Sequence, residues 1–96
     1  MAEDSSIFIG TKPFMNYVTG VVMQFTTKGA DIVTVKARGK FISRAVDVAE
    51  VSSKRFLEGA VVTRGININS EEFTNKEGRQ VRVSTIEIQL ARKGAQ

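Results

Sequence analysis

The final part of the chain contains two alternating segments that are unusually long for a domain of this size. Residues 60–73 and 79–91 flank the turn sequence Asn75-Lys76-Glu77-Gly78, so together they predict a β-hairpin. Two strands of about 13 residues each reach roughly 40 Å, whereas about five or six residues is the usual strand length. In a protein of 96 residues such a hairpin has to extend past the rest of the domain.

The return strand of this hairpin changes the face on which its apolar residues lie. These residues are odd-numbered at first and even-numbered later: Val81 and Val83, then Ile86, Ile88 and Leu90. Alternating burial allows this only with a bulge or a change of environment near Ser84-Thr85. We therefore expect residues 86–90 to lie in the main sheet and residues of about 71–83 to project from it. A hairpin packed flat on the domain is the alternative, and it would bury Arg79 and Arg82.

The residues before the hairpin begin with a strand, a helix and a second strand. Residues 6–10 form a short apolar run, and residues 31–37 alternate and are rich in β-branched side chains, so both segments predict strands. Pro13 suits the first position of a helix, because it lacks only an N–H that has no partner there. Apolar residues recur at helical spacing to about Lys28, and Gly29 is a typical stop.

A second helix is expected from about residue 40 to residue 57. Its apolar stripe comprises Ile42, Ala45, Val46, Ala49 and Phe56. On its polar side, Arg44 is spaced to pair with Asp47 and Glu50 with Lys54. Met15 and Met23 of the first helix are expected in the core. The order β-α-β-α-β-β therefore predicts one α+β domain over residues 1–96, with a long protruding C-terminal hairpin.

The composition removes several kinds of chemistry. The sequence has no cysteine, which excludes disulfides and cysteine-ligated zinc, and no histidine, which excludes a Ser-His-Asp triad. The carboxylates are scattered or paired with bases, and the adjacent Glu71 and Glu72 point to opposite faces of a strand. We therefore expect no enzyme activity, no metal site and no cofactor.

The charge and the N-terminal sequence indicate the partner and the compartment. A formal net charge of +4 favours a polyanion such as nucleic acid. The first six residues, MAEDSS, are acidic and polar, and they lack the positive charge of a signal peptide. No apolar run approaches the about 18 residues of a membrane span. We therefore expect an intracellular protein that does not bind membranes.

Basic residues gather at two predicted strand-to-helix junctions. The second junction, KARGKFISR (36–44), contains no acid and four cations: Lys36, Arg38, Lys40 and Arg44. The first two share a strand face, and the last two share a side of the following helix. Thr11-Lys12-Pro13 occupies the equivalent junction of the first unit. Because helix N-termini also offer free N–H groups, the two junctions predict a surface that binds phosphates.

Two known nucleotide- and RNA-binding motifs do not fit residues 36–44. A P-loop requires Ser or Thr after Gly-Lys, and here Phe41 follows Gly39-Lys40. An RNA-binding signature of the type K/R-G-F/Y-G/A fails at Lys40. A solvated turn without a ligand remains the alternative to a phosphate-binding surface.

Specific motifs run through essentially the whole chain. They are GTKPFMNYV (10–18), VKARGKFISRAVDVAE (35–50), KRFL (54–57) and EGRQVRVSTIEI (77–88). These segments resemble the Alba, or Sac10b, family of small archaeal chromatin proteins, which has eukaryotic relatives in RNase P and RNase MRP. The resemblance implies the β-α-β-α-β-β fold, similar to the C-terminal domain of bacterial translation initiation factor three.

The resemblance also implies a function. The expected protein is a homodimer, or a heterodimer with a paralogue, that coats and compacts double-stranded DNA with little sequence preference. Its body would lie on the phosphate backbone while two hairpin arms follow the grooves, and the protein would be associated with the chromosome or nucleoid in the cytoplasm. RNA is a further expected partner. A primarily RNA-binding role, of the RNase P type or in RNA stabilisation, is the alternative.

Position by position, the resemblance assigns binding roles to particular residues. The body surface would comprise Lys12, Asn16, Tyr17, Lys36, Arg38, Lys40 and Arg44, and the hairpin would contribute Lys76, Arg79 and Arg82. Phe56, with Leu57, would connect dimers along the duplex. Tyr17 could instead pack its ring on the body, and Asn16 could bond to local backbone. The family's acetylated lysine position holds Thr11 here, which leaves Lys12 as the neighbouring lysine.

Overall fold

The computed structural model describes residues 4–94, so the first three residues of the acidic N-terminal segment lie outside the described part. The elements are β1 (Asp4–Phe8), α1 (Phe14–Thr26), β2 (Ile32–Arg38), the 3-10 turn η1 (Gly39–Phe41), α2 (Ile42–Val51), the π-helical turn η2 (Ser52–Phe56), β3 (Val61–Thr74) and β4 (Gln80–Arg92). The predicted order β-α-β-α-β-β is confirmed. No helix within residues 4–94 is long and apolar enough to cross a membrane.

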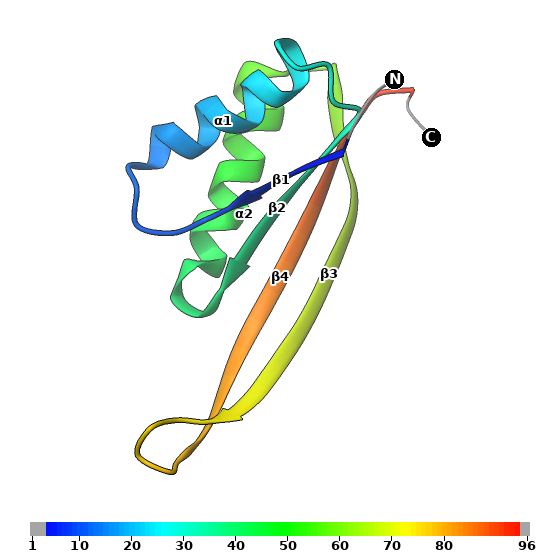
Figure 1. Ribbon diagram of the computed structural model, residues 1–96. Helices are drawn as coiled ribbons and strands as arrows, with labels where there is room; N and C mark the ends of the chain where they lie inside the picture. Colours follow the sequence, from blue (N-terminus) through cyan, green and yellow to red (C-terminus); the bar gives the residue numbers. More distant parts are fainter. Residues whose placement is uncertain (1–3, 95–96) are drawn as a thin grey trace.

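One four-stranded sheet with the order β1-β2-β4-β3 forms the framework. β1 and β2 are parallel, while β4 is antiparallel to both β2 and β3. Both helices lie on the same side of this sheet, and its other side, the open face, has no helix over it (Figure 1).

The core lies between the helices and the sheet. Val18, Val21 and Phe25 share one side of α1 and are fully buried, together with Val33 on β2 and Leu90 on β4. The expectation that Met15 and Met23 belong to the core is wrong, because both are exposed. At 100° per residue, Met23 faces away from the buried stripe and Met15 lies at its edge. Helix α1 also begins one residue later than expected, with Pro13 as its N-cap.

The second helix differs from the expected single stripe. The α-helical part ends at Val51, and the π turn follows, with the Leu57 N–H donating to the Ser52 carbonyl at 3.0 Å. The extra residue of a π turn shifts the next side chains around the axis. As a result Leu57 is 7% exposed and enters the core, whereas Phe56 is 53% exposed. Val46, expected on the apolar stripe, is also exposed.

The long hairpin is present and extends beyond the body of the molecule (Figure 1). β2 pairs with β4 only between Thr85 and Ala91, so the pairs from Ser70–Ser84 to Thr74–Gln80 bond only to each other. Residues 70–84 are called the arm here, and the remainder is called the body. The molecule measures 47 × 28 × 20 Å. Arg79 and Arg82 are exposed, which contradicts a hairpin packed flat on the domain.

The change of face in β4 arises from a change of environment. The register of β4 runs without interruption through Ser84 and Thr85, and the bulge of this hairpin lies in β3, between Thr63 and Gly65. The apolar residues before residue 85 lie on the open face. There Val83 approaches the η1 turn, because a Cβ on Gly39 would lie 3.8 Å from its Cγ1 atom. The N-terminal part of β4 therefore packs against the η1 turn, while its C-terminal part packs under the helices.

Candidate nucleic-acid interface

The two strand-to-helix junctions lie against each other. Arg44, in the first turn of α2, donates from Nη2 to the carbonyl oxygen of Lys12 at 2.9 Å. The expected pairing of Arg44 with Asp47 is therefore replaced by a bond to the neighbouring loop, whereas the Glu50–Lys54 ion pair forms at 2.8 Å. Lys40 precedes Arg44 by about one helical turn. We call Lys12, Lys40 and Arg44 the body cluster.

Tyr17 holds the first loop in place. Its ring is buried, and its hydroxyl oxygen accepts hydrogen bonds from the N–H groups of Gly10 and Lys12 at 2.9 and 3.0 Å. This is the packing role expected as the alternative for Tyr17, and its part in nucleic-acid binding stays a prediction. Asn16 is exposed, and its backbone N–H donates to the Pro13 carbonyl at 3.0 Å. Tyr17 thus positions Lys12.

The second loop depends on a glycine. Gly39 has φ of +56°, a conformation that strains side-chain-bearing residues, and it turns the chain from β2 into η1. Lys40 follows and is exposed, with Nζ 5.5 Å from the centroid of the Phe41 ring. No side chain caps the first N–H groups of α1, η1 or α2 within the described residues. Both junctions therefore combine cations with helix N-termini that no side chain caps, an arrangement suited to phosphate.

Lys36 and Arg38 do not join the body cluster. They lie on the open face, where Lys36 Nζ is 3.8 Å from Glu87 Oε2 and Arg38 Nη2 is 2.8 Å from Glu71 Oε1. The Arg38–Glu71 pair passes over β4, since Arg38 is opposite Thr85 and Glu71 is opposite Val83. The four cations of KARGKFISR thus divide into two that are paired with carboxylates and two, Lys40 and Arg44, that have no carboxylate partner within residues 4–94. Lys40 is exposed, whereas Arg44 is half-buried and its Nε atom is buried.

The arm presents its cations mainly at the tip. The Asn75 side-chain oxygen Oδ1 accepts hydrogen bonds from the N–H groups of Glu77 and Arg79 at 2.9 and 3.0 Å, which fixes the turn. Arg82 pairs across the strands with Glu72. Lys76 and Arg79 have no ion pair with a carboxylate among residues 4–94.

The two residues expected to connect dimers are placed differently. Phe56 is exposed on η2 and is available for contact, whereas Leu57 is buried in the core and is not.

Carboxylates do not cluster into a metal site: residues 4–94 contain no group of three acidic side chains able to hold a metal ion.

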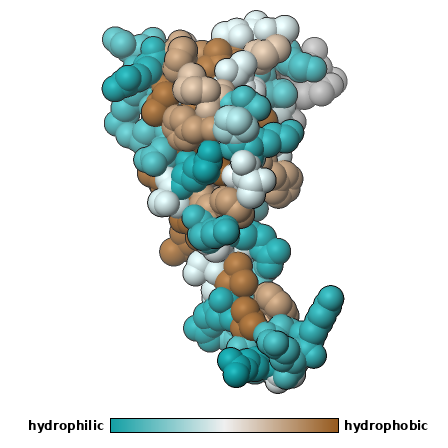
Figure 2. Space-filling model, turned by 90° about the vertical axis from the view of Figure 1, so that its left-hand side faces the viewer, coloured by the Kyte–Doolittle hydropathy of each residue, from teal (hydrophilic) through white to brown (hydrophobic). Residues whose placement is uncertain are grey.

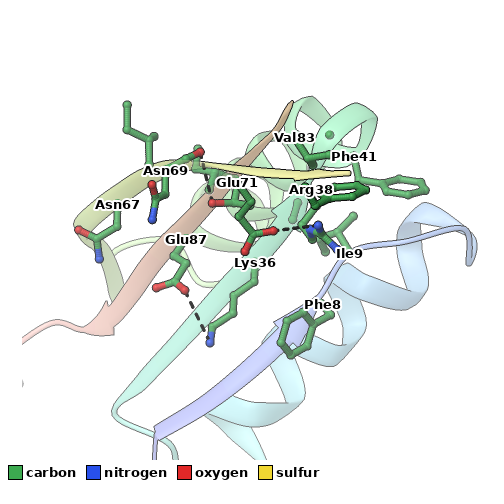
Figure 3. A pocket seen from close by; sticks show the side chains of 16 residues that line it. Phe8, Ile9, Lys36, Arg38, Phe41, Asn67, Asn69, Glu71, Val83 and Glu87 are labelled. Carbon is green, nitrogen blue, oxygen red and sulfur yellow. Dashed lines mark hydrogen bonds and ion pairs between the residues drawn. The ribbon is translucent and has the colours of Figure 1, made fainter. Parts of the chain in front are cut away.

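Sequence reasoning missed a hollow on the open face. It has a volume of about 790 Å³, and the side chains that line it include Phe8, Lys36, Arg38, Asn67, Asn69 and Glu71 (Figure 3). Phe8 is 71% exposed, although it lies in an apolar run. Alternation in SIFIG was the available signal, because it places Phe8 on the opposite face from Ile7 and Ile9.

A second apolar surface lies on the helix side of β3. Ile66 and Ile68 are opposite Ile88 and Ile86 of β4, yet they are 58% and 79% exposed. β3 is one of the two edge strands, and the helices do not reach across it (Figure 1). Apolar surface is also exposed on the body and along the arm in the space-filling view (Figure 2).

Comparison with known proteins gives the family. The family model described as Alba matches residues 5–70. The chain belongs to the Alba family. The DNA/RNA-binding protein Alba of Methanocella arvoryzae is 52% identical over 95 residues, which cover 99% of this chain and 97% of the relative. The DNA/RNA-binding protein Alba of Nanoarchaeum equitans is 57% identical over 88 residues, covering 91% and 97%.

A solved structure supports the Alba fold as well. Alba from Thermoplasma volcanium superposes with a TM-score of 0.81 at 44% identity, covering 91% of this chain and 99% of that one. The resemblance read from the four sequence motifs and the expected Alba fold are therefore both confirmed.

Proposed function

We propose that this Alba-family protein binds double-stranded DNA through the phosphate backbone and acts as an architectural protein of the chromosome or nucleoid. The observation that carries the proposal is the body cluster, in which two loops meet and present Lys12, Lys40 and Arg44 beside uncapped helix N-termini. Each cation that replaces condensed counterions on a phosphate contributes about 0.9 to the salt dependence of binding. The relatives named DNA/RNA-binding proteins support this function.

Weak sequence preference follows from the side chains that face solvent. The body cluster has no Asn, Gln or bidentate Arg presented from a helix toward base edges, and such groups read the major groove. Lysines beside helix termini contact phosphates, which are the same for every sequence. Binding is therefore the whole activity we propose, with no catalytic step.

A second copy of the chain is the partner that fits the exposed isoleucines. Ile66 and Ile68 lie on a long edge strand, and uncovered edges of this kind favour association. A twofold pair formed there would present two body clusters and two arms to one duplex. Ile68→Glu should give monomers in analytical ultracentrifugation. Val62→Glu, on the same strand outside this patch, should leave the dimer intact, and dimers in both variants would contradict the assignment.

The arms and Phe56 have secondary roles in the proposal. Lys76, Arg79 and Arg82 would follow the grooves and touch backbone at their edges, and arginine suits a narrow minor groove. Phe56 would connect neighbouring dimers, while the buried Leu57 would support it from beneath. Lys12 is the lysine whose acetylation would weaken binding, because Thr11 carries no charge.

RNA is the second candidate partner, supported by the names of the relatives. A cluster that recognises phosphates can also bind an A-form helix, where 2′-hydroxyl groups offer further contacts. Titration of matched DNA and RNA duplexes would rank the two partners. Tighter RNA binding at physiological salt would make RNA the main partner and chromosome architecture the lesser role.

The proposal is tested by removing two cations from the body cluster. Lys12→Ala with Lys40→Ala should weaken binding to a DNA duplex at least about tenfold and reduce the salt slope by roughly 1.8 per protomer engaged. Lys28→Ala with Lys93→Ala removes the same charge away from the two junctions and is the matched control. Equal losses in both double variants would mean that net charge, and not this cluster, holds the duplex.

A further inference from the structure

Phe8 occupies an unusual position for an aromatic side chain. It lies on the edge strand β1 and on the open face, with 71% of its surface exposed. Lys36 Nζ lies 5.4 Å from the centroid of its ring, and Figure 3 shows the ring at the border of the hollow. A cation near the ring holds it by a cation–π contact, while most of the ring remains open to solvent. An exposed, oriented ring of this kind is a stacking platform for a nucleobase.

The charges in the hollow favour a neutral group over a phosphate. Its two cations, Lys36 and Arg38, are matched by the carboxylates of Glu87 and Glu71. A phosphate would meet both carboxylates at close range, and like charges at such distances repel strongly. A base carries no charge, and its donors and acceptors suit carboxylates and amides.

Amide side chains complete the hollow. Asn67 and Asn69 alternate along β3 and lie on the same face as Glu87 and Thr85, the residues opposite them on β4. Figure 3 shows both asparagines on the side of the hollow that Glu87 borders. Asn67 is in the same cross-strand row as Phe8, since it pairs with Glu87, Glu87 with Lys36, and Lys36 with Phe8. The ring and the hydrogen-bonding groups therefore face solvent together on one side of the sheet.

Cations lie at both ends of the hollow. Phe8 also borders a second hollow of about 550 Å³, which is lined by Lys12 and Asn16. In the other direction the first hollow reaches Phe73 on the arm, next to the turn that carries Lys76 and Arg79. A single strand of several nucleotides can therefore place phosphates at the two basic ends and its bases between them. Paired bases cannot reach the hollow, because they are stacked inside the duplex.

We propose that the hollow on the open face binds unpaired bases of a single-stranded nucleic acid, with one base stacked on Phe8 and a neighbouring base hydrogen-bonded by Asn67 or Asn69. The hollow itself is separate from the body cluster, although the phosphates of the strand would meet Lys12, Lys76 and Arg79, which the proposed function also uses. Its loss would leave the salt-dependent duplex binding of the body cluster unchanged, so failure of one proposal can be distinguished from failure of the other.

The sequence contains no tryptophan, so Phe8→Trp introduces a single fluorophore at the site. Titration with an oligothymidylate or oligouridylate of about 12 nucleotides should quench its emission, because a stacked base quenches indole fluorescence. An oligonucleotide of the same length without bases, and a DNA duplex, should bind with little quenching. Val46→Trp, exposed on α2 and absent from the lining of both hollows, is the matched control and should not be quenched.

Affinity gives a second readout that does not depend on tryptophan. Phe8→Ala should weaken binding of either oligonucleotide at least about fivefold and leave the duplex affinity unchanged, while Phe8→Tyr keeps the ring and should restore binding. Binding without quenching, quenching by the base-free strand, equal loss of duplex affinity in Phe8→Ala, or no binding of either oligonucleotide would each overturn the proposal. Tighter binding of oligouridylate than of oligodeoxyuridylate, which differs from it only in the sugar, would identify RNA as the preferred strand.

Discussion

The body and the arm each present lysine on a loop that one side-chain oxygen organises. In the body, the Tyr17 hydroxyl accepts N–H groups from Gly10 and Lys12; in the arm, Asn75 Oδ1 accepts N–H groups from Glu77 and Arg79. The difference is in the support behind them. The Tyr17 ring is buried in the core, whereas the arm strands bond only to each other.

The two regions also differ in charge. Residues 71–83 contain three cations and three carboxylates, so the arm has no net charge, and one of its cations is paired across the strands. The body cluster has three cations, none of which is paired with a carboxylate within residues 4–94. From this comparison we expect the unpaired body cluster to supply most of the affinity and the arm to supply reach.

The largest difference in duplex affinity between the two regions is expected when the Tyr17 hydroxyl and the Asn75 side-chain oxygen are removed in turn. Tyr17→Phe leaves two N–H groups without their acceptor and should weaken duplex binding about fivefold, with a destabilisation of about 1–2 kcal/mol. Asn75→Ala removes the acceptor of the Glu77 and Arg79 N–H groups, but on the exposed arm water can replace it. The variant should therefore lower the affinity for the duplex by less than about twofold. Fluorescence anisotropy and thermal unfolding measure both effects. A larger loss for Asn75→Ala would reverse the comparison.

A smaller effect is expected from the carboxylates that hold cations in each region. Glu71→Gln releases the body residue Arg38, and Glu72→Gln releases the arm residue Arg82. The variants are adjacent in sequence and change the charge equally. Because an exposed ion pair is worth at most about 1 kcal/mol, Glu71→Gln should strengthen duplex binding by about threefold at most. Glu72→Gln should strengthen it less, and identical gains would show that only net charge matters.

The smallest change in single-dimer affinity is expected for the exposed aromatic residues. Phe56→Ala on the body should leave binding to a short duplex unchanged but reduce cooperativity on a long duplex, if dimers meet through this ring. Phe73→Ala on the arm should change neither cooperativity nor short-duplex affinity by more than about twofold. Comparing the Hill slopes on long DNA with the affinities for short DNA separates these outcomes. Loss of short-duplex affinity in Phe56→Ala would contradict the connecting role.

Patterns that repeat over several residues were predictable from the sequence. The element order and the long hairpin followed from alternation, helical spacing and the excess length of residues 60–91. The π turn was not predictable, because the apolar stripe in the sequence looks the same with or without it. In the structure the turn places Leu57 in the core and leaves Phe56 exposed. The errors at Met15 and Met23 arose because apolar character was used without its angular position on α1.

The contacts within the candidate site were harder to predict, because they depend on which distant residues the fold brings together. Lys12, Lys40 and Arg44 were identified from two junctions, but their contact needed the fold, because 32 residues separate the partners of the Arg44–Lys12 bond. Pairing of Arg38 with Glu71 could not be predicted either, since it spans β4 and depends on which residues face each other there. The exposure of Phe8 follows from the alternation of residues 6–10, but the apolar character of the whole run conceals it.

The most direct test of the central claim compares the intact protein with one whose residues 71–83 are replaced by Asn-Gly, a turn that suits the facing Ser70–Ser84 pair. The salt dependence of duplex binding is measured for both. We predict that the shortened protein, folded and dimeric, retains more than about half of the intact slope, because the body cluster makes most phosphate contacts. A nearly flat slope in the shortened protein would contradict the account and show that the arm holds the duplex.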